Sequence, residues 1–203
     1  LTLAKQTFPK IKIIKNKTNL GFAAAINQGI QKATYDWVIP CNNDLKLSKN
    51  WFIITASAIK QYPNISTFFG TVKNYDGSKI ESTGLKFFIK GKCLNIRKKI
   101  FQPKLIFGGN AALIIYKKSV LNQVGLFDSD FFAYEEDVDL ALRLNNSGHQ
   151  TLLVPSAVSY HLGGATSSKM GNFRHRMDTK NWIFIIIKNY SAKTILKNFF
   201  PIL

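Results

Sequence analysis

Acidic side chains gather at one place in the sequence. The run Glu135-Glu136-Asp137-Val138-Asp139 holds four of the eleven acidic residues of the chain. At the start of a helix such a cluster gains from the helix dipole, although its charges repel one another. If the cluster is buried, one carboxylate takes a raised pKa and can act as a general base. A solvated helix N-terminus is the alternative, and the aromatic residues between positions 127 and 134 favour the edge of a cleft.

A second carboxylate, Asp44, follows the amides Asn42 and Asn43 directly after a run that reads as a buried strand. In open α/β sheets, ligands bind beyond the carboxyl ends of the strands. A carboxylate flanked by amides at that position can hold a hard divalent cation that also binds phosphates. An ordinary turn, in which Asp44 caps a neighbouring segment, is the alternative.

His161 is the third candidate for chemistry. It lies in the run Ser159-Tyr160-His161-Leu162-Gly163, after a predicted strand, and a loop position is expected for it. Neutral imidazole is a good partner for an aspartate in binding a transition-metal ion. A lone histidine also often has a purely structural role, so that alternative stays open.

Glycines at two places can bring the backbone close to a ligand. Asn19-Leu20-Gly21 precedes a predicted helix that carries Asn27. The N-terminus of such a helix can receive a phosphate, although a tight turn alone also explains the glycine. The segment Gly108-Gly109-Asn110 permits close approach of a ligand, and equally permits a β-bulge.

The elements that must position these residues alternate along the first third of the chain. A short β-rich run over 11–14 is followed by a helix over 22–33, a strand over 35–40 and a helix over 49–62. This alternation predicts an α/β fold with a mostly parallel sheet flanked by helices. Further along, the pattern predicts strands over 66–72, 111–115 and 151–155, and helices over 117–124, 135–146 and 172–189.

The composition limits the class of protein to which this chain can belong. A chain of 203 residues suits one domain, and its 46% apolar and 19% charged residues are typical of a globular protein. The longest uninterrupted apolar run, from Trp182 to Ile187, is far shorter than the roughly 20 residues that span a bilayer. The two cysteines, Cys41 and Cys93, have no short spacing and predict neither a zinc site nor a disulfide framework.

The net charge of +17 favours anionic partners: nucleic acid, anionic lipid or phosphorylated ligands. Only four of the 28 basic residues are arginine, whereas DNA-reading proteins rely on arginine for base edges. The sequence also carries no zinc-finger, RNA-recognition or basic-zipper pattern. Nucleic acid is therefore not expected, and an anionic small molecule or a membrane surface is the predicted partner.

Taken in order, these motifs resemble the family 2 glycosyltransferases of the rhamnosyltransferase-like branch. The family carries an asparagine-x-glycine-phenylalanine turn, a later asparagine-x-glycine, and a strand that ends in asparagine-x-aspartate. The resemblance runs from about Lys15 to Gly164 and continues weakly through Asn181. It implies a GT-A fold, which is Rossmann-like, with a nucleoside-diphosphate sugar as donor and an inverting mechanism.

The resemblance also implies roles for single residues. Asp44 would bind Mg²⁺ or Mn²⁺, and His161 would join that metal. Asp137 would be the base that deprotonates the acceptor hydroxyl, with Glu136 beside it to orient the acceptor. The remaining matches are donor-binding positions and a loop that lines the sugar and the acceptor. The donor-binding positions are Asn19, Gly21, Asn27, Asn42, Asn43 and Asp44, and the loop is Gly108, Gly109 and Asn110.

The resemblance has one departure. The family begins with strands that bind the nucleotide base and ribose, and no such motif precedes the matched region here. We therefore expect an N-terminally truncated GT-A domain over residues 1–180, with an exposed apolar sheet edge. Residues 181–203 are expected to form an amphipathic tail that either lies on an anionic membrane surface or packs against the domain.

The function predicted from these observations is that of an inverting glycosyltransferase, or a fragment of one. It would transfer a sugar to a hydroxyl of a glycan or lipid-linked acceptor during assembly of cell-envelope polysaccharide. The expected location is the cytoplasm, with a peripheral position at the inner face of the plasma membrane as an alternative. A catalytically inactive remnant and a basic protein that binds membrane or nucleic-acid surfaces are the competing interpretations.

Overall fold

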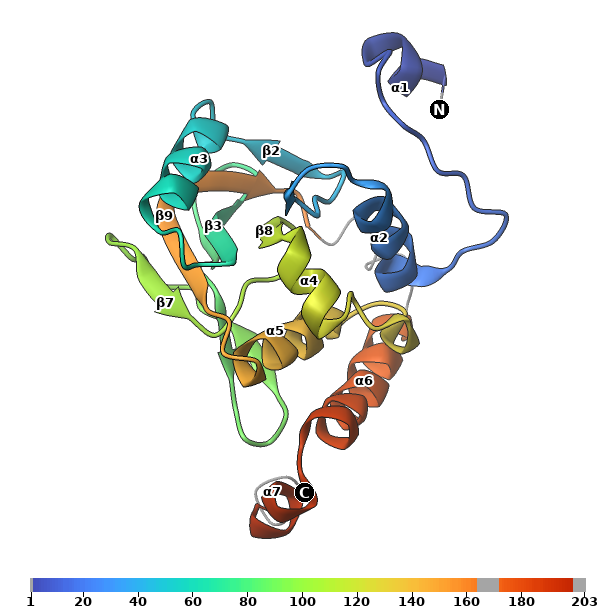
Figure 1. Cartoon of the computed structure of the whole chain (residues 1–203), viewed down its shortest axis with the longest axis vertical. Helices are drawn as coiled ribbons and strands as arrows, with labels where there is room; N and C mark the ends of the chain where they lie inside the picture. Colours follow the sequence, from blue (N-terminus) through green and yellow to red (C-terminus); the bar gives the residue numbers. More distant parts are fainter. Residues whose placement is uncertain (1, 164–171, 199–203) are drawn as a thin grey trace.

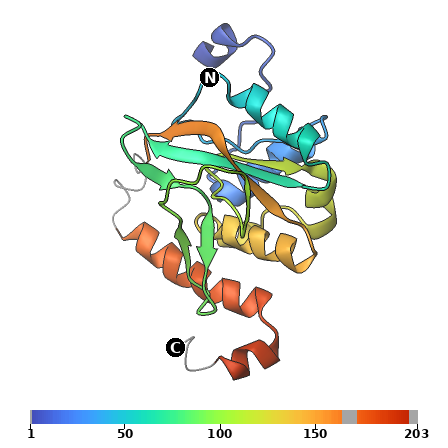
Figure 2. The same cartoon turned by 90° about the vertical axis from the view of Figure 1, so that its left-hand side faces the viewer.

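The structure is a computed structural model that describes residues 2–163 and 172–198. A seven-stranded sheet lies at its centre, with helices on both faces (Figure 1). Helix α3 (Trp51–Gln61) covers one face, while α2 (Gly21–Lys32), α4 (Lys118–Val124) and α5 (Glu136–Asn146) cover the other. The view turned by 90° shows α3 and α5 on opposite sides of the sheet (Figure 2). The predicted α/β class is confirmed.

The main path of the sheet has the order β1-β8-β3-β9-β2, with β4 added to β3 and β7 added to β9. Strands β5 and β6 form a separate hairpin. In chain order the strands are β1 (Trp37–Val38), β2 (Leu45–Leu47), β3 (Thr67–Asn74), β4 (Ile80–Ser82), β5 (Leu85–Phe87), β6 (Cys93–Asn95), β7 (Lys104–Ile106), β8 (Ile114–Lys117) and β9 (Thr151–His161).

The prediction that the sheet is mostly parallel is wrong in detail. Among the described strands only β3 and β9 pair in parallel, and every other pairing is antiparallel. Strands β1 and β3 are both antiparallel to β8, so they run in the same direction, as the alternation predicts. They are not neighbours, because β8 arrives from later in the chain and lies between them.

The predicted helices agree with the observed ones to within two residues at each end. The strands agree less well. The predicted run over 11–14 has no regular structure, and Ile11 and Ile14 are exposed rather than buried. The predicted strand over 35–40 shortens to Trp37–Val38. The remaining helices are α1 (Thr2–Thr7), α6 (Phe173–Asn189), α7 (Ala192–Lys197) and the short 3₁₀ helix η1 (Ser129–Phe131).

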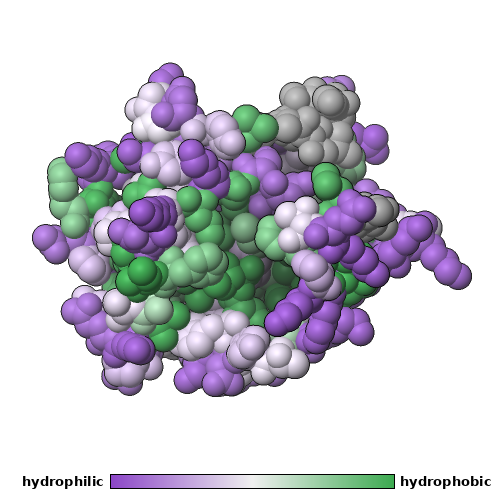
Figure 3. Space-filling model, turned by 90° about the horizontal axis from the view of Figure 1, so that it is seen from above, coloured by the Kyte–Doolittle hydropathy of each residue, from purple (hydrophilic) through white to green (hydrophobic). Residues whose placement is uncertain are grey.

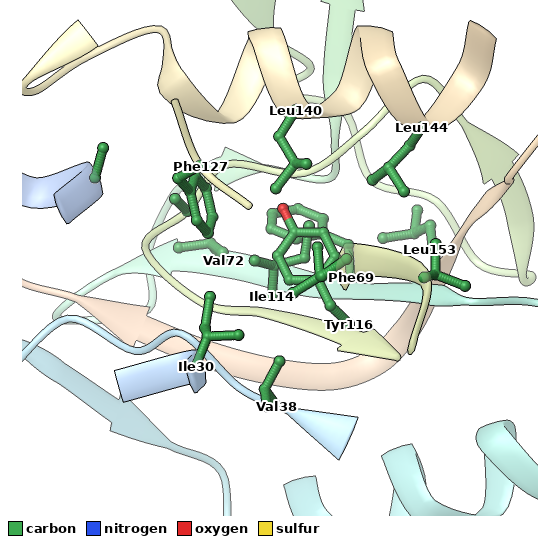
Figure 4. Packing of buried hydrophobic residues seen from close by; sticks show 14 residues of the cluster. Ile30, Val38, Phe69, Val72, Ile114, Tyr116, Phe127, Leu140, Leu144 and Leu153 are labelled. Carbon is green, nitrogen blue, oxygen red and sulfur yellow. The ribbon is translucent and has the colours of Figure 1, made fainter. Parts of the chain in front are cut away.

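The main hydrophobic core lies between the sheet and helix α5. Leu140 and Leu144 stand one turn apart on the helix face that meets Phe69, Ile114 and Tyr116 of the sheet (Figure 4). On the other face the fully buried Trp51 of α3 anchors a second cluster. The first cluster thus holds α5, which begins with the candidate residues Glu136 and Asp137, against the sheet.

Helix α6 belongs to the folded body. Its Ile185 is fully buried in a third cluster with Leu85 of the β5–β6 hairpin and Phe131 of η1. The predicted boundary between residues 180 and 181 therefore falls inside a helix that packs against the domain. None of the described helices has the length and apolar character needed to cross a membrane.

Candidate functional site

Asp44 and His161, predicted separately, lie side by side. Asp44 immediately precedes β2, and His161 ends β9, which pairs with β2 so that His161 is opposite Leu45. The carbonyl oxygen of Asp44 accepts a hydrogen bond of 3.0 Å from the amide of Leu162. The Nε2 atom of His161 is 3.2 Å from Oδ1 of Asp44. His161 thus lies at the end of a strand rather than in the loop that the sequence predicted.

An irregularity in β9 contributes to this placement. Gly70 of β3 pairs with Val154, but the next residue, Thr71, pairs with Val158, so three residues of β9 bulge out of the ladder. A Cβ atom on Gly70 would lie 2.1 Å from the carbonyl oxygen of Ala157, which explains why a glycine stands there. Beyond the bulge, β9 resumes its pairing and delivers His161 next to Asn74.

Glu81 completes this group, and sequence reasoning missed it. Its Oε2 atom is 3.1 Å from Nδ1 of His161, and it comes from β4, which pairs with β3. A carboxylate at Nδ1 favours the tautomer with its proton there, which leaves the lone pair of Nε2 directed toward Asp44. Nothing in the local sequence Ile80-Glu81-Ser82 signals this contact. We call Asp44, Glu81 and His161 the histidine cluster.

The histidine cluster offers two ligand atoms to a metal. The Oδ1 atom of Asp44 is buried and has no hydrogen-bond partner among the described residues, although Nε2 of His161 is close to it. Two atoms that are adjacent without being bonded to each other suit a shared cation, since neighbouring ligands of an octahedral ion are about 3 Å apart. The residues therefore fit Mg²⁺ or Mn²⁺, and the imidazole favours a transition metal.

The described residues alone do not complete such a site. No group of three or more histidine, cysteine or acidic residues in the described part of the chain could hold a metal ion together. Glu81 contacts the opposite nitrogen of the imidazole ring from Asp44 and does not converge with it. A cation here would need further ligands besides these two side chains.

The acidic cluster is presented by a loop with unusual backbone. Phe132, Tyr134 and Glu135 have φ angles of 62°, 69° and 65°, a region that side chains rarely adopt. Each such residue costs about 1–3 kcal/mol and persists only where the surroundings hold it. We call residues 131–137 the acidic loop. Helix α5 begins within it at Glu136.

Asn181 of α6 holds the acidic loop. Its side-chain amide is fully buried and lies within donor distance of three backbone carbonyls, those of Phe131, Ala133 and Tyr134, at 2.9, 2.8 and 2.6 Å. Nearby, Lys188 forms ion pairs with Asp128 and Asp130 at 2.5 and 2.8 Å. Sequence reasoning missed Asn181 because it treated residue 181 as the start of a tail.

Asp137 has the hydrogen bonds expected of a carboxylate that must ionise. Its Oδ2 atom accepts from the amide of Ala111 at 3.0 Å, and its Oδ1 atom from the amide of Val138 at 2.8 Å. Burial raises the pKa of Asp137, and these donors oppose that effect by stabilising the charged form. A carboxylate whose pKa is raised but whose anion is also stabilised suits a general base.

The two neighbouring glutamates are less well stabilised as anions. Burial, with a smaller contribution from Asp137, raises the pKa of Glu136. Burial, followed by the charges of Asp137 and Asp178, raises the pKa of Glu135 to about 8. The Oε2 atoms of both are buried without a hydrogen-bond partner in the described structure. Solvation at a helix N-terminus, the alternative for this cluster, is excluded by this burial.

The loop of Gly108, Gly109 and Asn110 lies beside Asp137, because the next residue, Ala111, donates to that carboxylate. A Cβ atom on Gly109 would lie 2.1 Å from the ring of Phe69, and one on Gly108 would lie 2.7 Å from Ala141. Both glycines therefore permit close approach within the protein. Asn110 donates to Asn95 of the β5–β6 hairpin at 3.1 Å.

Residues 111 and 112 connect the segment that carries Asp44 to the carboxylate of Asp137. The amide of Asn42 donates to the carbonyl of Ala112 at 2.9 Å, and Ala111 donates to Asp137. The strand end that carries Asn42 and Asp44 is thus joined through two consecutive residues to the predicted base. Asn43, between them, is exposed.

The predicted donor residues near the start of α2 lie against the acidic loop. Gly21 has a φ angle of 82°, and its backbone amide donates a hydrogen bond of 2.9 Å to Oδ1 of Asn19. The amide of Phe22 donates to Phe132 at 2.6 Å. The side chain of Asn27 exchanges two hydrogen bonds with the backbone of Phe127, at 2.7 and 3.1 Å. The bond from Phe22 attaches α2 to the acidic loop, and the two bonds of Asn27 attach it to Phe127, just before that loop.

Seen from above, the molecule carries a broad apolar area with a hollow, edged by hydrophilic residues (Figure 3). Separately, a cavity of about 570 Å³ lies between the segment around Lys10 and Lys12, helix α2 and the region of β1. Most of its walls are apolar, and its charged lining residues are all lysines. Its lining contains no carboxylate and no histidine among the described residues, and it can receive an apolar or anionic group.

Comparison with known proteins identifies the fold. The family model described as Glycosyl transferase family 2 matches residues 2–125. Two proteins from strains of Mycobacterium tuberculosis (CDC 1551 / Oshkosh and ATCC 25618 / H37Rv) are 25% identical to this chain over 186 residues. Each is described as N-acetylglucosaminyl-diphospho-decaprenol L-rhamnosyltransferase. The match covers 78% of this chain and 61% of those relatives, so the chain spans less than two thirds of their length.

Two solved structures share the fold. GalNAc-T7 with UDP, GalNAc and Mn²⁺ has a TM-score of 0.69 at 15% identity, covering 91% of this chain and 38% of that protein. The mannosyltransferase PcManGT from Pyrobaculum calidifontis, in complex with GDP-Man and Mn²⁺, has a TM-score of 0.60 at 16% identity, covering 99% and 53%. The predicted GT-A-like class is confirmed.

Proposed function

Because this chain belongs to glycosyl transferase family 2, we propose that it forms the catalytic domain, or part of it, of an inverting glycosyltransferase. The donor would be a nucleoside-diphosphate sugar, and the acceptor a hydroxyl of a glycan or of a lipid-linked saccharide. The observation that carries this proposal is a chain of hydrogen bonds through Ala111 and Ala112. It joins Asn42, two residues before Asp44, to the buried carboxylate of Asp137.

In this proposal Asp137 removes the proton of the acceptor hydroxyl as its oxygen attacks the anomeric carbon. A single displacement needs one base, and it inverts the configuration at that carbon. The amides of Ala111 and Val138 hold the carboxylate in place before the reaction. Glu136, beside it and buried, would help to orient the acceptor.

Asp44 and His161 would hold Mg²⁺ or Mn²⁺ with the donor diphosphate. When bound, the ion neutralises the charge that develops on the leaving diphosphate. Support comes from the unpartnered Oδ1 atom of Asp44 and from the Mn²⁺ named for both solved structures of this fold. Asn19, Gly21, Asn27, Asn42 and Asn43 remain proposed donor-binding residues.

Two observations support the proposed class of acceptor: the name of the relatives and the net charge of this chain. The relatives' name includes an N-acetylglucosaminyl-diphospho-decaprenol acceptor, and the net charge of +17 favours an acceptor that carries phosphate. Assembly of cell-envelope polysaccharide at the inner face of the plasma membrane would fit such an acceptor. The exposed Leu196 of α7 is a candidate contact for an anionic membrane surface.

Calorimetric titration with UDP- and dTDP-sugars, with and without Mn²⁺, tests the proposal. We expect binding that requires the metal, and a loss of at least about tenfold in affinity for Asp44→Ala. Asp36→Ala is the matched control, because Asp36 is exposed and lies outside the site. Absence of binding by the folded chain would favour the inactive-remnant interpretation. Metal-independent binding of anions with a steep salt dependence would favour the basic surface binder.

A further inference from the structure

We infer that a cavity beside the acidic loop is the subsite for the acceptor saccharide, a pyranose that carries a phosphate; this rests on the proposed function. The cavity has a volume of about 330 Å³ and opens between the β5–β6 hairpin and helix α6. The residues that carry the argument are Cys93, Glu135, His175, Asp178, Thr179 and Trp182. The volume lies at the lower end of the range for small-molecule sites, which suits a single sugar ring.

The cavity adjoins the proposed base. Glu135 lines it and is separated from Asp137 by one residue. Cys93, on the opposite wall, is close enough to both carboxylates that their charges, after burial, raise the pKa of its thiol. A hydroxyl of a sugar in this cavity would therefore lie on the same side of the acidic loop as Asp137.

The polar groups of the cavity suit sugar hydroxyls. The Oε2 atom of Glu135 is buried and finds no partner among the described residues. A buried oxygen of this kind costs free energy unless a ligand supplies a donor. Asp178 adds a second carboxylate, with a side chain that is 40% exposed. Carboxyl groups exchange hydrogen bonds with hydroxyl groups, accepting when ionised and also donating when protonated, and thereby distinguish a sugar from an apolar ligand.

The apolar and basic groups complete the match. Trp182 is half-buried and lines the cavity, so its ring can pack against the C–H face of a pyranose. Lys92 lies over this ring at 5.3 Å, and the exposed His175 stands at the opening. Lys92 would face a phosphate on the same sugar through a charge-assisted hydrogen bond, and the ring of His175 would add a further hydrogen bond.

The cavity is preformed. The indole Nε1 of Trp182 donates to the carbonyl of Lys90 at 2.5 Å, and the hydroxyl of Tyr190 donates to that of Ile89 at 2.8 Å. These bonds tie the turn of the β5–β6 hairpin to helix α6. Asn181 on the same helix fixes the acidic loop. Both walls are thus held by one helix, and a ligand would not have to order them.

Calorimetric titration with N-acetylglucosamine 1-phosphate tests the inference directly. We expect Thr179→Trp, which fills the cavity from an exposed position on α6, to weaken this binding at least tenfold. Ile183→Trp is the matched control, because Ile183 is exposed on the same helix and does not line the cavity. Asp178→Asn should weaken binding without adding bulk. Plain N-acetylglucosamine should bind more weakly than its phosphate.

The donor titration separates this inference from the proposed function. Normal metal-dependent donor binding in Thr179→Trp, with loss of sugar-phosphate binding, supports the subsite. Sugar-phosphate binding unchanged in both Thr179→Trp and Asp178→Asn, or no sugar-phosphate binding by a wild-type chain that binds donor, overturns the subsite and leaves the glycosyltransferase proposal standing. If the wild-type chain does not bind the donor at all, the result contradicts the proposed function instead.

Discussion

The acidic loop and the histidine cluster are built in opposite ways. The acidic loop is strained, its carboxylates are buried, and a helix from elsewhere in the chain holds its backbone by three carbonyls. The histidine cluster lies at the ends of β2 and β9, is partly exposed, and contains a buried oxygen without a protein partner among the described residues. The carbonyls of the acidic loop have partners within the protein, whereas Oδ1 of Asp44 has none among the described residues.

The difference matches the proposed tasks. A base must keep its position and its protonation state before the acceptor arrives, and burial with fixed donors achieves both. A cation that arrives with its diphosphate brings its own charge and further ligands, so two side chains are enough to receive it. Changes in the acidic loop should therefore alter turnover and stability, whereas changes in the histidine cluster should alter donor binding.

The largest effect is expected for Asp137→Asn. Because the amide cannot take the acceptor proton, turnover should fall about 10³-fold, while the donor dissociation constant changes little. Steady-state kinetics and donor calorimetry on the same preparation measure both quantities. Turnover close to that of the wild type would show that Asp137 is not the base. The acidic loop and the histidine cluster would then no longer differ in the way proposed.

Asn181→Ala should lower the free energy of unfolding by about 2–3 kcal/mol, because three buried carbonyls lose their donor. Asn189→Ala is the matched control on α6: it removes one hydrogen bond of 2.8 Å to Asp139 and should cost about 1 kcal/mol. Denaturant titration measures both.

If Asn181 also positions the base, its alanine variant should lose turnover about tenfold at temperatures where it stays folded, with an unchanged donor KM. Turnover that stays normal in the folded variant would reduce Asn181 to a purely structural residue.

Glu81→Ala should weaken Mn²⁺-dependent donor binding about tenfold, because His161 loses the partner that orients its ring. Glu81→Gln, which retains an acceptor for the Nδ1 proton, should lose less. Calorimetry with Mn²⁺ present and absent separates the metal-dependent part. Equal affinity in all three proteins would show that the histidine cluster does not depend on Glu81.

The smallest effect concerns pH. Since the pKa of Glu135 is raised in the folded chain from its ordinary 4.5 to about 8, the folded state holds this proton longer than the unfolded state does. Stability should therefore decline as pH rises from about 4.5 to about 8 and then level off. Glu135→Gln should flatten that decline by about 1 kcal/mol, measured by denaturant titration across this range. An unchanged slope would show that Glu135 is solvated.

Much of the fold could be predicted from local pattern. The spacing of apolar residues predicts helices α2 and α5, and Gly148 follows the end of α5 as a helix-stop signal. The sheet could not be predicted in the same way, because strand neighbours are chosen by distant parts of the chain. Nothing near residue 37 reveals that Lys117 will be its partner.

The site residues also fall into two groups, those that local sequence predicts and those that it does not. Asp44, His161 and Asp137 stand out because each follows or begins a recognisable element, and the structure brings the first two together. Glu81 and Asn181 do not stand out, since each acts on a partner far along the chain: His161 is 80 residues from Glu81. Their roles follow only once β4 lies beside β3 and α6 lies against the acidic loop.

The hydrogen bonds of Asn181 also order events during synthesis. Phe131 leaves the ribosome 50 residues before Asn181 does. At translation rates of about 5–20 residues per second, the acidic loop waits several seconds for the amide that closes it. Until then its carbonyls face water and its backbone is free to relax. The backbone of the acidic loop is therefore fixed only after residue 181 has been made, and a chain stopped at residue 180 should show fast amide exchange across residues 131–137.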